Sequence, residues 1–79
     1  MGKRKNLPDI RERFGFAIKA RREVLGLTQE DLAELARIHR TYVSDIERGA
    51  RNVSLINVER MANALKMSLS ALFAHVERS

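Results

Sequence analysis

The stretch from Thr28 to Gly49 constrains the fold most, because it predicts two short helices joined by a tight turn. Thr28 is a good N-cap, since its hydroxyl can accept from the backbone N–H of Asp31, and acidic residues in the first turn complement the helix dipole. The apolar stripe of this first helix consists of Leu32, Ala33, Leu35 and Ala36. After a gap of about three residues, a second periodic stretch runs to Gly49, which supplies a C-terminal stop.

The second helix of the pair combines a dry face with a wet one. Val43 and Ile46 point inward, whereas long polar side chains occupy the other faces. These polar residues are Arg40, Thr41, Ser44, Asp45 and Arg48. Two helices joined by a short turn, the second presenting polar groups, match the motif that places a recognition helix in the major groove of DNA.

The segment TQEDLA, an apolar residue in the turn and the segment RTYVSDIERG resemble the Cro and repressor type of helix-turn-helix domain, the XRE-like family. Within that family, RTYVSDIERGARNVSL is most similar to the controller proteins of restriction-modification systems. The resemblance extends over roughly residues 14 to 73. It implies an all-α, compact five-helix bundle of the phage-repressor DNA-binding type. It also implies a homodimeric transcription regulator that activates and represses from adjacent operators.

Two positions depart from the family pattern. Arg37 stands where the turn usually has Gly or Asn, and a left-handed conformation there would cost an L-residue on the order of 1 kcal/mol. His39 stands where the second helix usually has a Ser or Asp cap, and it is a weaker cap. Both departures concern the geometry of the turn and leave the motif in place.

The length of 79 residues allows one small domain, which is marginally stable alone, so we expect oligomerisation. The absence of cysteine and the distance between His39 and His75 in the sequence argue against a metal site, and we expect no cofactor. No apolar run approaches the roughly 18 residues of a membrane span, and no signal sequence is recognisable. We therefore expect a cytoplasmic protein with no membrane partner.

The net charge of +5 favours polyanionic partners, and its distribution is uneven. Residues 1–27 contain eight basic and three acidic residues. Residues 28–36 contain three acidic residues and no basic one, and residues 37–52 contain four basic and two acidic residues. Positive charge therefore lies on both sides of the first helix of the pair. Such an arrangement would favour a phosphate backbone, with an affinity that falls as salt rises.

The rest of the chain predicts helices throughout and no sheet. Residues 1–8 form a basic arm that is either functional or simply a disordered terminus, and residues 9–79 form a single DNA-binding and dimerisation domain. We expect helices over residues 9–25, 28–36, 40–48, 54–65 and 69–77, with caps at Asp9, Thr28, Ser54 and Ser68. Ile10, Phe14, Ala17, Ile18 and Leu25 mark the inner face of the first helix. Phe16 lies off that face, either at a groove edge, which we favour, or exposed.

We assign the candidate DNA contacts from their place on the motif. Arg40 and Thr41 begin the recognition helix, so we expect them at base edges, with Ser44 next and Asp45 last, since its charge would repel phosphate. The expected backbone contacts are Gln29, Tyr42, Arg48, Arg51 and Asn52. For Tyr42, packing against the first helix of the pair is an equal alternative.

The family resemblance implies an ion pair between Arg22 and Glu47 that fixes one helix against another. The alternative is that Arg22 is exposed near phosphate. A partly buried pair could also place the guanidinium beside phosphate.

The C-terminal third carries spare apolar side chains. Leu55, Val58, Met61, Ala62 and Leu65 form the core stripe of the fourth helix, which leaves Ile56 beside the stripe. A single exposed Ile would need no explanation, but others accompany it. We therefore expect a dimer interface formed by Ile56, Leu69, Leu72 and Phe73, with Val76 as a further candidate.

Other classes of function are less well supported by the sequence. Ser44 beside Asp45 is not a hydrolase site, and the carboxylates of Glu30, Asp31 and Glu34 share one short helix as a solvated face, so we do not expect an enzyme. Within DNA binding, a Cro-like phage repressor or an antitoxin-like regulator stays open, and outside it a protein-interaction module. The expected partners are double-stranded DNA with a palindromic operator, a second copy of the chain and, for activation, RNA polymerase.

Overall fold

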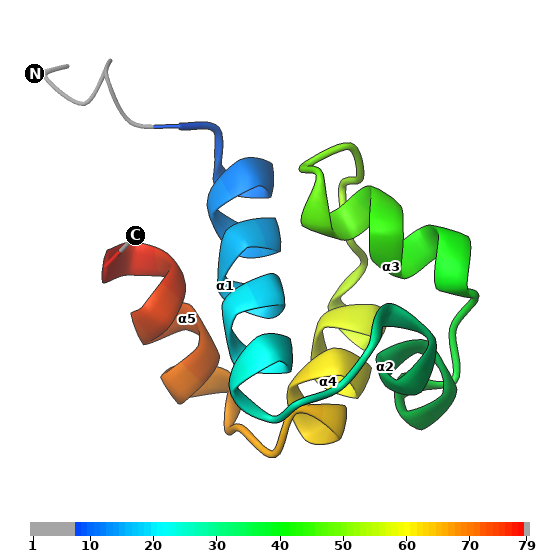
Figure 1. Cartoon of the computed structure of the whole chain (residues 1–79). Helices are drawn as coiled ribbons and strands as arrows, with labels where there is room; N and C mark the ends of the chain where they lie inside the picture. The colour runs from blue at the N-terminus through cyan, green and yellow to red at the C-terminus, as the bar shows by residue number, and fades with distance from the viewer. Residues whose placement is uncertain (1–7, 79) are drawn as a thin grey trace, which may run out of the picture.

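The computed structural model describes residues 8–78, and these form five helices and no strand. The helices are α1 (Ile10–Val24), α2 (Gln29–Ala36), α3 (Arg40–Glu47), α4 (Leu55–Ala64) and α5 (Leu69–Arg78). In Figure 1, α1 stands between α5 on one side and α3 on the other, and α4 lies below them beside α2. The five predicted spans agree with these bounds to within one residue at each end. The predicted arm, residues 1–8, lies outside the described residues except for Pro8.

The helices begin where the sequence places caps. The Asp9 side chain accepts from the N–H of Arg11 at 2.8 Å, and Ser54 Oγ accepts from that of Asn57 at 3.2 Å. Thr28 forms a reciprocal pair with Asp31, in which each side chain accepts from the other residue's backbone N–H. Such caps satisfy N–H groups that the first turn leaves without an intrahelical partner. The local sequence therefore sets the helix starts.

Two turns use left-handed backbone at residues other than glycine. Arg37 ends α2 with φ 62°, so the position does take the conformation that the family usually gives to Gly or Asn. Lys66 does the same after α4, with φ 60°. In both turns the next residue donates its N–H back into the helix: Ile38 to the carbonyl of Ala33, and Met67 to that of Ala62, so the closing hydrogen bonds are retained.

A single apolar core joins all five helices. It consists of Phe14, Ala17, Ile18, Leu32, Ala33, Ala36, Val43, Ile46, Val58, Met61, Ala62, Leu65, Leu72 and Val76. Phe14 also contacts Phe73 of α5, with ring centroids 6.3 Å apart. The inward faces predicted for α3 and for most of α4 are confirmed.

Several apolar predictions are wrong. Leu72 and Val76 are buried in the core, because they form the inward stripe of α5 one turn apart, so neither can belong to a dimer interface of the folded chain. Leu35 is 58% exposed, because the buried face of α2 consists of Leu32, Ala33 and Ala36. Leu55, the first residue of α4, is 83% exposed, and the buried face of the helix begins one turn later, at Val58. Ile10 is likewise exposed in the first turn of α1.

Gly15 allows α1 to lie directly against the end of α3. A Cβ at this position would stand 2.1 Å from the carbonyl oxygen of Ile46 and 3.0 Å from that of Glu47. Both atoms belong to the backbone, so no side-chain rotation could make room. The close approach therefore depends on the missing side chain.

None of the helices within residues 8–78 is both long and apolar enough to cross a membrane.

Candidate nucleic-acid interface

The first turn of α3 presents its side chains to solvent. His39 caps the helix, and its Nδ1 accepts from the backbone N–H of Thr41 at 3.1 Å. Arg40 and Thr41 are exposed and Ser44 is half-buried. A shallow hollow brings together six of the predicted contact residues: Gln29, Arg40, Thr41, Ser44, Asp45 and Arg48. The structure thus places the beginning of α2 and the outer face of α3 on one surface.

The opposite end of α3 is anchored inside the molecule. Arg22 of α1 forms a two-pronged ion pair with Glu47, from Nε to Oε2 at 2.6 Å and from Nη2 to Oε1 at 3.0 Å. The Arg22 and Glu47 side chains are only 12% and 4% exposed. Arg22 Nη1 also donates to the carbonyl of Leu27, and Gln29 Nε2 donates to Glu47 Oε1 at 2.9 Å. The hydrogen bonds to Glu47 raise the pKa of Arg22. Glu47 therefore ties α3 to both α1 and α2.

Gln29 accordingly has a second role besides the one predicted from its position. Its side-chain amide nitrogen is engaged with Glu47, while the residue still lines the hollow in front of α3. A contact to phosphate would then use the backbone N–H groups at the start of α2 or the remaining side-chain donor. Gln29 thus links the interior pair to the exposed surface.

Asp45 holds two of the predicted backbone-contact residues. Its Oδ1 accepts from Arg48 Nη2 at 2.5 Å, and its Oδ2 accepts from Arg51 Nε at 3.2 Å. Partial burial would raise the pKa of Asp45, but the hydrogen bonds from Arg51 and Arg48 outweigh it and lower the pKa. The carboxylate therefore stays ionised near neutral pH and is already occupied by protein donors. This occupation weighs against the predicted role of Asp45 as a base contact.

The ring of Tyr42 is partly buried against the core, and the Arg51 guanidinium carbon lies 4.8 Å from the ring centroid. This geometry suits a cation–π contact. The Tyr42 ring thus packs against the core and also supports Arg51, while its packing against α2 and its contact with the DNA backbone both stay predictions. Asn52 follows Arg51 in the loop and is exposed.

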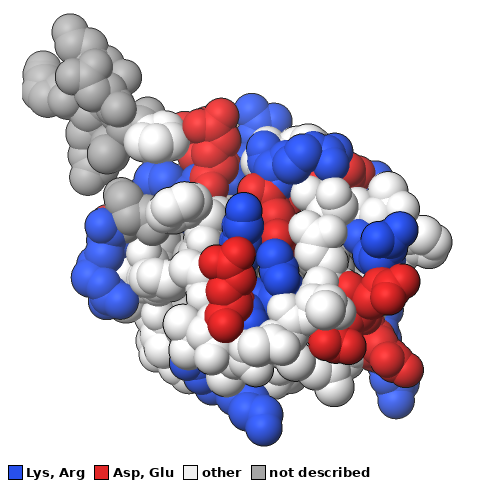
Figure 2. All heavy atoms as spheres, viewed as in Figure 1, with Lys and Arg blue, Asp and Glu red and all other residues white. Residues whose placement is uncertain are grey.

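The charges of this part of the molecule are mixed. In Figure 2, several acidic side chains lie where α2 lies in Figure 1, others lie at the centre and top of the same face, and basic side chains are spread between them. Arg40 Nε lies 3.9 Å from Glu30 Oε2, and both side chains are well exposed. Such an exposed pair is worth little, so Arg40 can exchange this partner for another acceptor.

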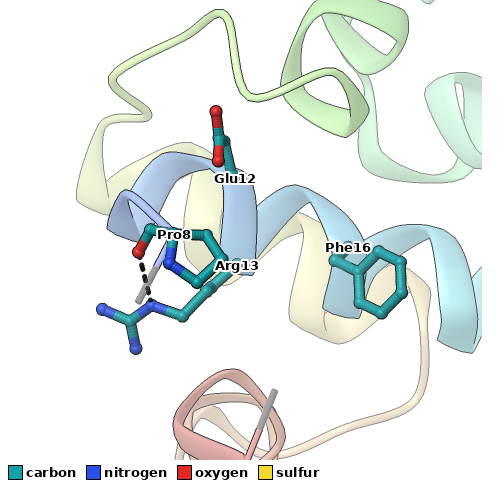
Figure 3. A pocket seen from close by; sticks show the side chains of 4 residues that line it. All are labelled: Pro8, Glu12, Arg13 and Phe16. Atoms are coloured by element: carbon teal, nitrogen blue, oxygen red, sulfur yellow. Dashed lines mark hydrogen bonds between the residues drawn. The ribbon is translucent and has the colours of Figure 1, made fainter. Parts of the chain in front are cut away.

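Phe16 lies on α1, apart from the surface of α3. It is 66% exposed, which is the alternative to the favoured groove edge, although it also lines a shallow hollow together with Pro8, Glu12 and Arg13. Figure 3 shows Arg13 turned toward the carbonyl of Pro8, to which its Nε donates at 3.1 Å, while Phe16 lies further along the helix. Nothing in this arrangement connects Phe16 to the predicted DNA contacts.

Three of the predicted dimer residues, Ile56, Leu69 and Phe73, are exposed on α4 and α5. They line one groove together with Leu55, Val58 and Glu59. Leu55, which the sequence places in the core, thus replaces Leu72 at this surface. We refer to Leu55, Ile56, Leu69 and Phe73 as the apolar groove.

Sequence reasoning missed three features that join parts of the fold to one another. Gly15 could have been noticed, because a glycine inside a helix that is otherwise well formed indicates a close approach. The contact of Asp45 with Arg48 has the signal of an oppositely charged i, i+3 pair on one helix, whereas its contact with Arg51 has no such signal. Nor does the hydrogen bond from Arg21 Nε to the carbonyl of Leu65 at 3.0 Å, which satisfies the end of α4 from α1.

Comparison with known proteins identifies the family. The helix-turn-helix family model matches residues 18–72. The control protein C.MunI of Mycoplasma sp is 45% identical over 71 residues, which cover 89% of this chain and 96% of that protein. The restriction-modification controller protein C.AhdI of Aeromonas hydrophila superposes with a TM-score of 0.78 at 43% identity, covering 80% of this chain and 96% of the other. The controller protein C.Esp1396I, solved as a tetramer in complex with its natural 35 base-pair operator, superposes with a TM-score of 0.84 at 33% identity, covering 91% and 95%. The chain belongs to the helix-turn-helix family of DNA-binding regulators, in its XRE-type branch, and is similar to the controller proteins of restriction-modification systems.

Proposed function

We propose that the protein is a sequence-specific transcription regulator that binds a palindromic operator as a homodimer and controls a restriction-modification system. The observation that carries the proposal is the similarity to controller proteins along nearly the whole chain, one of them solved on its operator. These relatives are regulators, which supports a binding function over an enzymatic one. A controller of this kind would activate from one operator, in contact with RNA polymerase, and repress when it also fills an adjacent one.

In this proposal, the N-terminal half of α3 reads base edges. Arg40 and Thr41 are exposed at its start, and Ser44 lies one turn further on the same hollow. A guanidinium can donate two parallel hydrogen bonds to O6 and N7 of guanine, which is the commonest specific contact in the major groove. Arg40 is therefore the first candidate for direct base recognition.

The residues around this helix would hold the phosphate backbone. Arg48 and Arg51 supply positive charge at the far end of α3, and Asn52 supplies an exposed amide in the next loop. Gln29 lies at the start of α2, where N–H groups and the helix dipole favour an anion, and the Tyr42 hydroxyl is the remaining candidate. Contacts of this kind fix the register of the protein without reading sequence.

Dimerisation through the apolar groove is supported by its position. A two-fold dimer that meets successive major grooves holds its recognition helices about 34 Å apart, so the interface must leave α2 and α3 free. The apolar groove lies on α4 and α5, which satisfies this condition. Burial of a Leu or Phe side chain there is worth roughly 1.5 to 3 kcal/mol each.

The test begins with selection of the preferred site from a library of randomised duplexes. The parent protein should enrich a palindrome, and its affinity should fall linearly on a plot of log affinity against log salt concentration. Arg40→Ala should then weaken binding to the selected site by about 1 to 3 kcal/mol and relax preference at one base pair of each half-site. Equal weakening on all sequences would make Arg40 a phosphate contact. Binding indifferent to salt would favour a protein partner instead.

The neighbouring genes give an independent test of the biological role. Restriction and methyltransferase genes beside this one would support the controller role. Their absence would favour a Cro-like repressor or an antitoxin-like regulator, which the same domain could also serve.

A further inference from the structure

We propose that Asp45 is a specificity-determining residue that holds Arg48 and Arg51 in one orientation, so that both arginines match phosphates in a single docking register. The inference rests on the proposed function and assigns Asp45 an indirect role. It is a positioning residue on the protein side of the interface and does not read a base.

The contacts of Asp45 reach beyond its own helix. Its carboxylate binds Arg48, at the end of α3, and Arg51, in the loop that follows. Its backbone carbonyl also accepts from the N–H of Ala50 at 2.9 Å, which folds the loop back toward α3. The Asp45 side chain is only 18% exposed, whereas both arginine side chains are about half exposed or more. A partly buried acceptor thus fixes two exposed donors.

The contacts with the protein engage only some of the N–H donors of each guanidinium. Arg48 uses Nη2 for Asp45 and Nη1 for Ser44 Oγ, at 3.0 Å, so its orientation is fixed from two sides. Arg51 uses Nε for Asp45, and its guanidinium lies over the ring of Tyr42. Within the described residues, Nη1 and Nη2 of Arg51 make no hydrogen bond to the protein. Because a guanidinium carries five N–H donors, Arg51 can bind Asp45 and a phosphate at once.

This arrangement distinguishes one phosphate position from others. A phosphate that meets the free edge of Arg51 gains a preorganised donor without disturbing Asp45. A phosphate elsewhere must draw the arginine away from Asp45 and is repelled by the carboxylate that remains. Loosely docked, non-specific complexes present phosphates at varied positions and therefore gain less from the two arginines. The carboxylate also offsets one of the two positive charges, which weakens the sequence-independent attraction.

Asp45→Asn tests this role, because it removes the charge and keeps the size of the side chain. Affinity should be measured on two duplexes, the site selected by the parent protein and a scrambled duplex of the same length. For the scrambled duplex we expect affinity to rise about threefold to fivefold and the salt slope to steepen by about one. Affinity for the selected site should not rise. The specificity ratio should therefore fall at least about threefold.

Glu34→Gln is the matched control for charge. Glu34 is an exposed carboxylate on α2 whose side chain holds neither arginine, and its replacement changes the net charge by the same amount. It should leave the specificity ratio unchanged. An equal fall of the ratio in both variants would mean that net charge alone is responsible, and the inference would be wrong.

Arg51→Lys separates orientation from charge and does not depend on the folding of the Asp45 variant. Lysine keeps the positive charge but cannot bind Asp45 and a phosphate through one planar group. The specificity ratio should fall while the salt slope stays the same. An unchanged ratio in Arg51→Lys, or in a folded Asp45→Asn protein, overturns the inference.

Two further outcomes have distinct meanings. If Asp45→Asn loses preference at a single base pair and binds the scrambled duplex as the parent does, Asp45 is a base contact and the positioning role is wrong. If the parent protein selects no sequence at all, the proposed function itself fails. A parent that selects a site, with variants that keep its specificity, contradicts only the role of Asp45.

Discussion

The surface of α2 and α3 and the surface of α4 and α5 differ in what they leave exposed. The outer face of α3 presents Arg40, Thr41 and Arg48, while its other end is anchored to α1 through Gly15 and Glu47. The α4–α5 surface instead presents the apolar groove, with Leu55 83% and Ile56 66% exposed. One face therefore combines charge with internal anchoring, and the other presents apolar side chains that are largely exposed.

This difference suits two kinds of contact. Phosphates and bases are recognised by donors whose positions are fixed before binding, so internal anchoring of α3 reduces the ordering that binding requires. An apolar groove gains free energy only when another apolar surface excludes water from it. A small domain of marginal stability can use the second kind of contact to stabilise itself as well.

The largest expected effect concerns the anchoring of α3. Gly15→Ala places a Cβ against the carbonyl oxygens of Ile46 and Glu47, so α1 and α3 must move apart. Even after the gain in helix propensity, we expect a loss of about 2 to 3 kcal/mol in the free energy of unfolding. Urea denaturation measures this. Gly26→Ala is the control: apart from the chain neighbours, no atom of the described residues lies within 4 Å of the Cβ that alanine would add, and the φ of +71° should cost only about 1 kcal/mol. Equal losses in both variants would contradict the steric argument.

The next effect concerns the buried ion pair. Glu47→Gln leaves the Arg22 charge mostly buried with a neutral partner, and we expect it to cost about 2 kcal/mol in the free energy of unfolding. It should also weaken operator binding, because the end of α3 loses its link to α1 and α2. Glu30→Gln makes the same chemical change at an exposed pair and should cost close to nothing. A Glu47→Gln protein as stable as the parent would show that the pair does not anchor the helix.

A third prediction tests the other surface. Leu55→Ala removes an exposed side chain, so the fold of the monomer should keep its helix content. If the apolar groove is the dimer interface, the dissociation constant of the dimer should rise about tenfold or more, and Ile56→Ala should act in the same way. Sedimentation equilibrium across a dilution series measures this. Leu35→Ala, the same change at an exposed position of α2, should leave the dimer intact. Variants of Leu55 and Ile56 that are as dimeric as the parent would place the interface elsewhere.

The sequence predicted features that depend on nearby residues. The helix bounds were accurate because caps such as Thr28 and Ser54 satisfy backbone groups within the next three residues. The left-handed backbone at Arg37 matches the Gly or Asn that the family usually has there, so it followed from the resemblance. The polar face of α3 followed from its helical period. These signals need no knowledge of the tertiary structure.

The errors concern features that neighbouring elements decide. Helical period identifies an inward face but not how far along the helix that face is covered, so the sequence places Leu55 inside although its side chain is 83% exposed. The sequence places Leu72 outside, because it does not show which of the apolar residues of α5 face the core. The contact of Asp45 with Arg51 depends on where a loop folds back, which no local pattern encodes.

The smallest expected effect concerns the charged loop beyond α3, where Arg51 is held by Asp45 and Tyr42. Arg51→Ala should remove one phosphate contact, so the slope of log affinity against log salt should become less steep by about one on the selected site. The loss of affinity itself should be modest at high salt, since counterion release then contributes little. Lys66→Asn is the control, because it removes one positive charge in the turn between α4 and α5, at a left-handed position that Asn tolerates. Its slope should match that of the parent. An unchanged slope in Arg51→Ala together with lost preference at one base pair would instead make Arg51 a base contact, and the loop would then belong to the recognition surface that α3 begins.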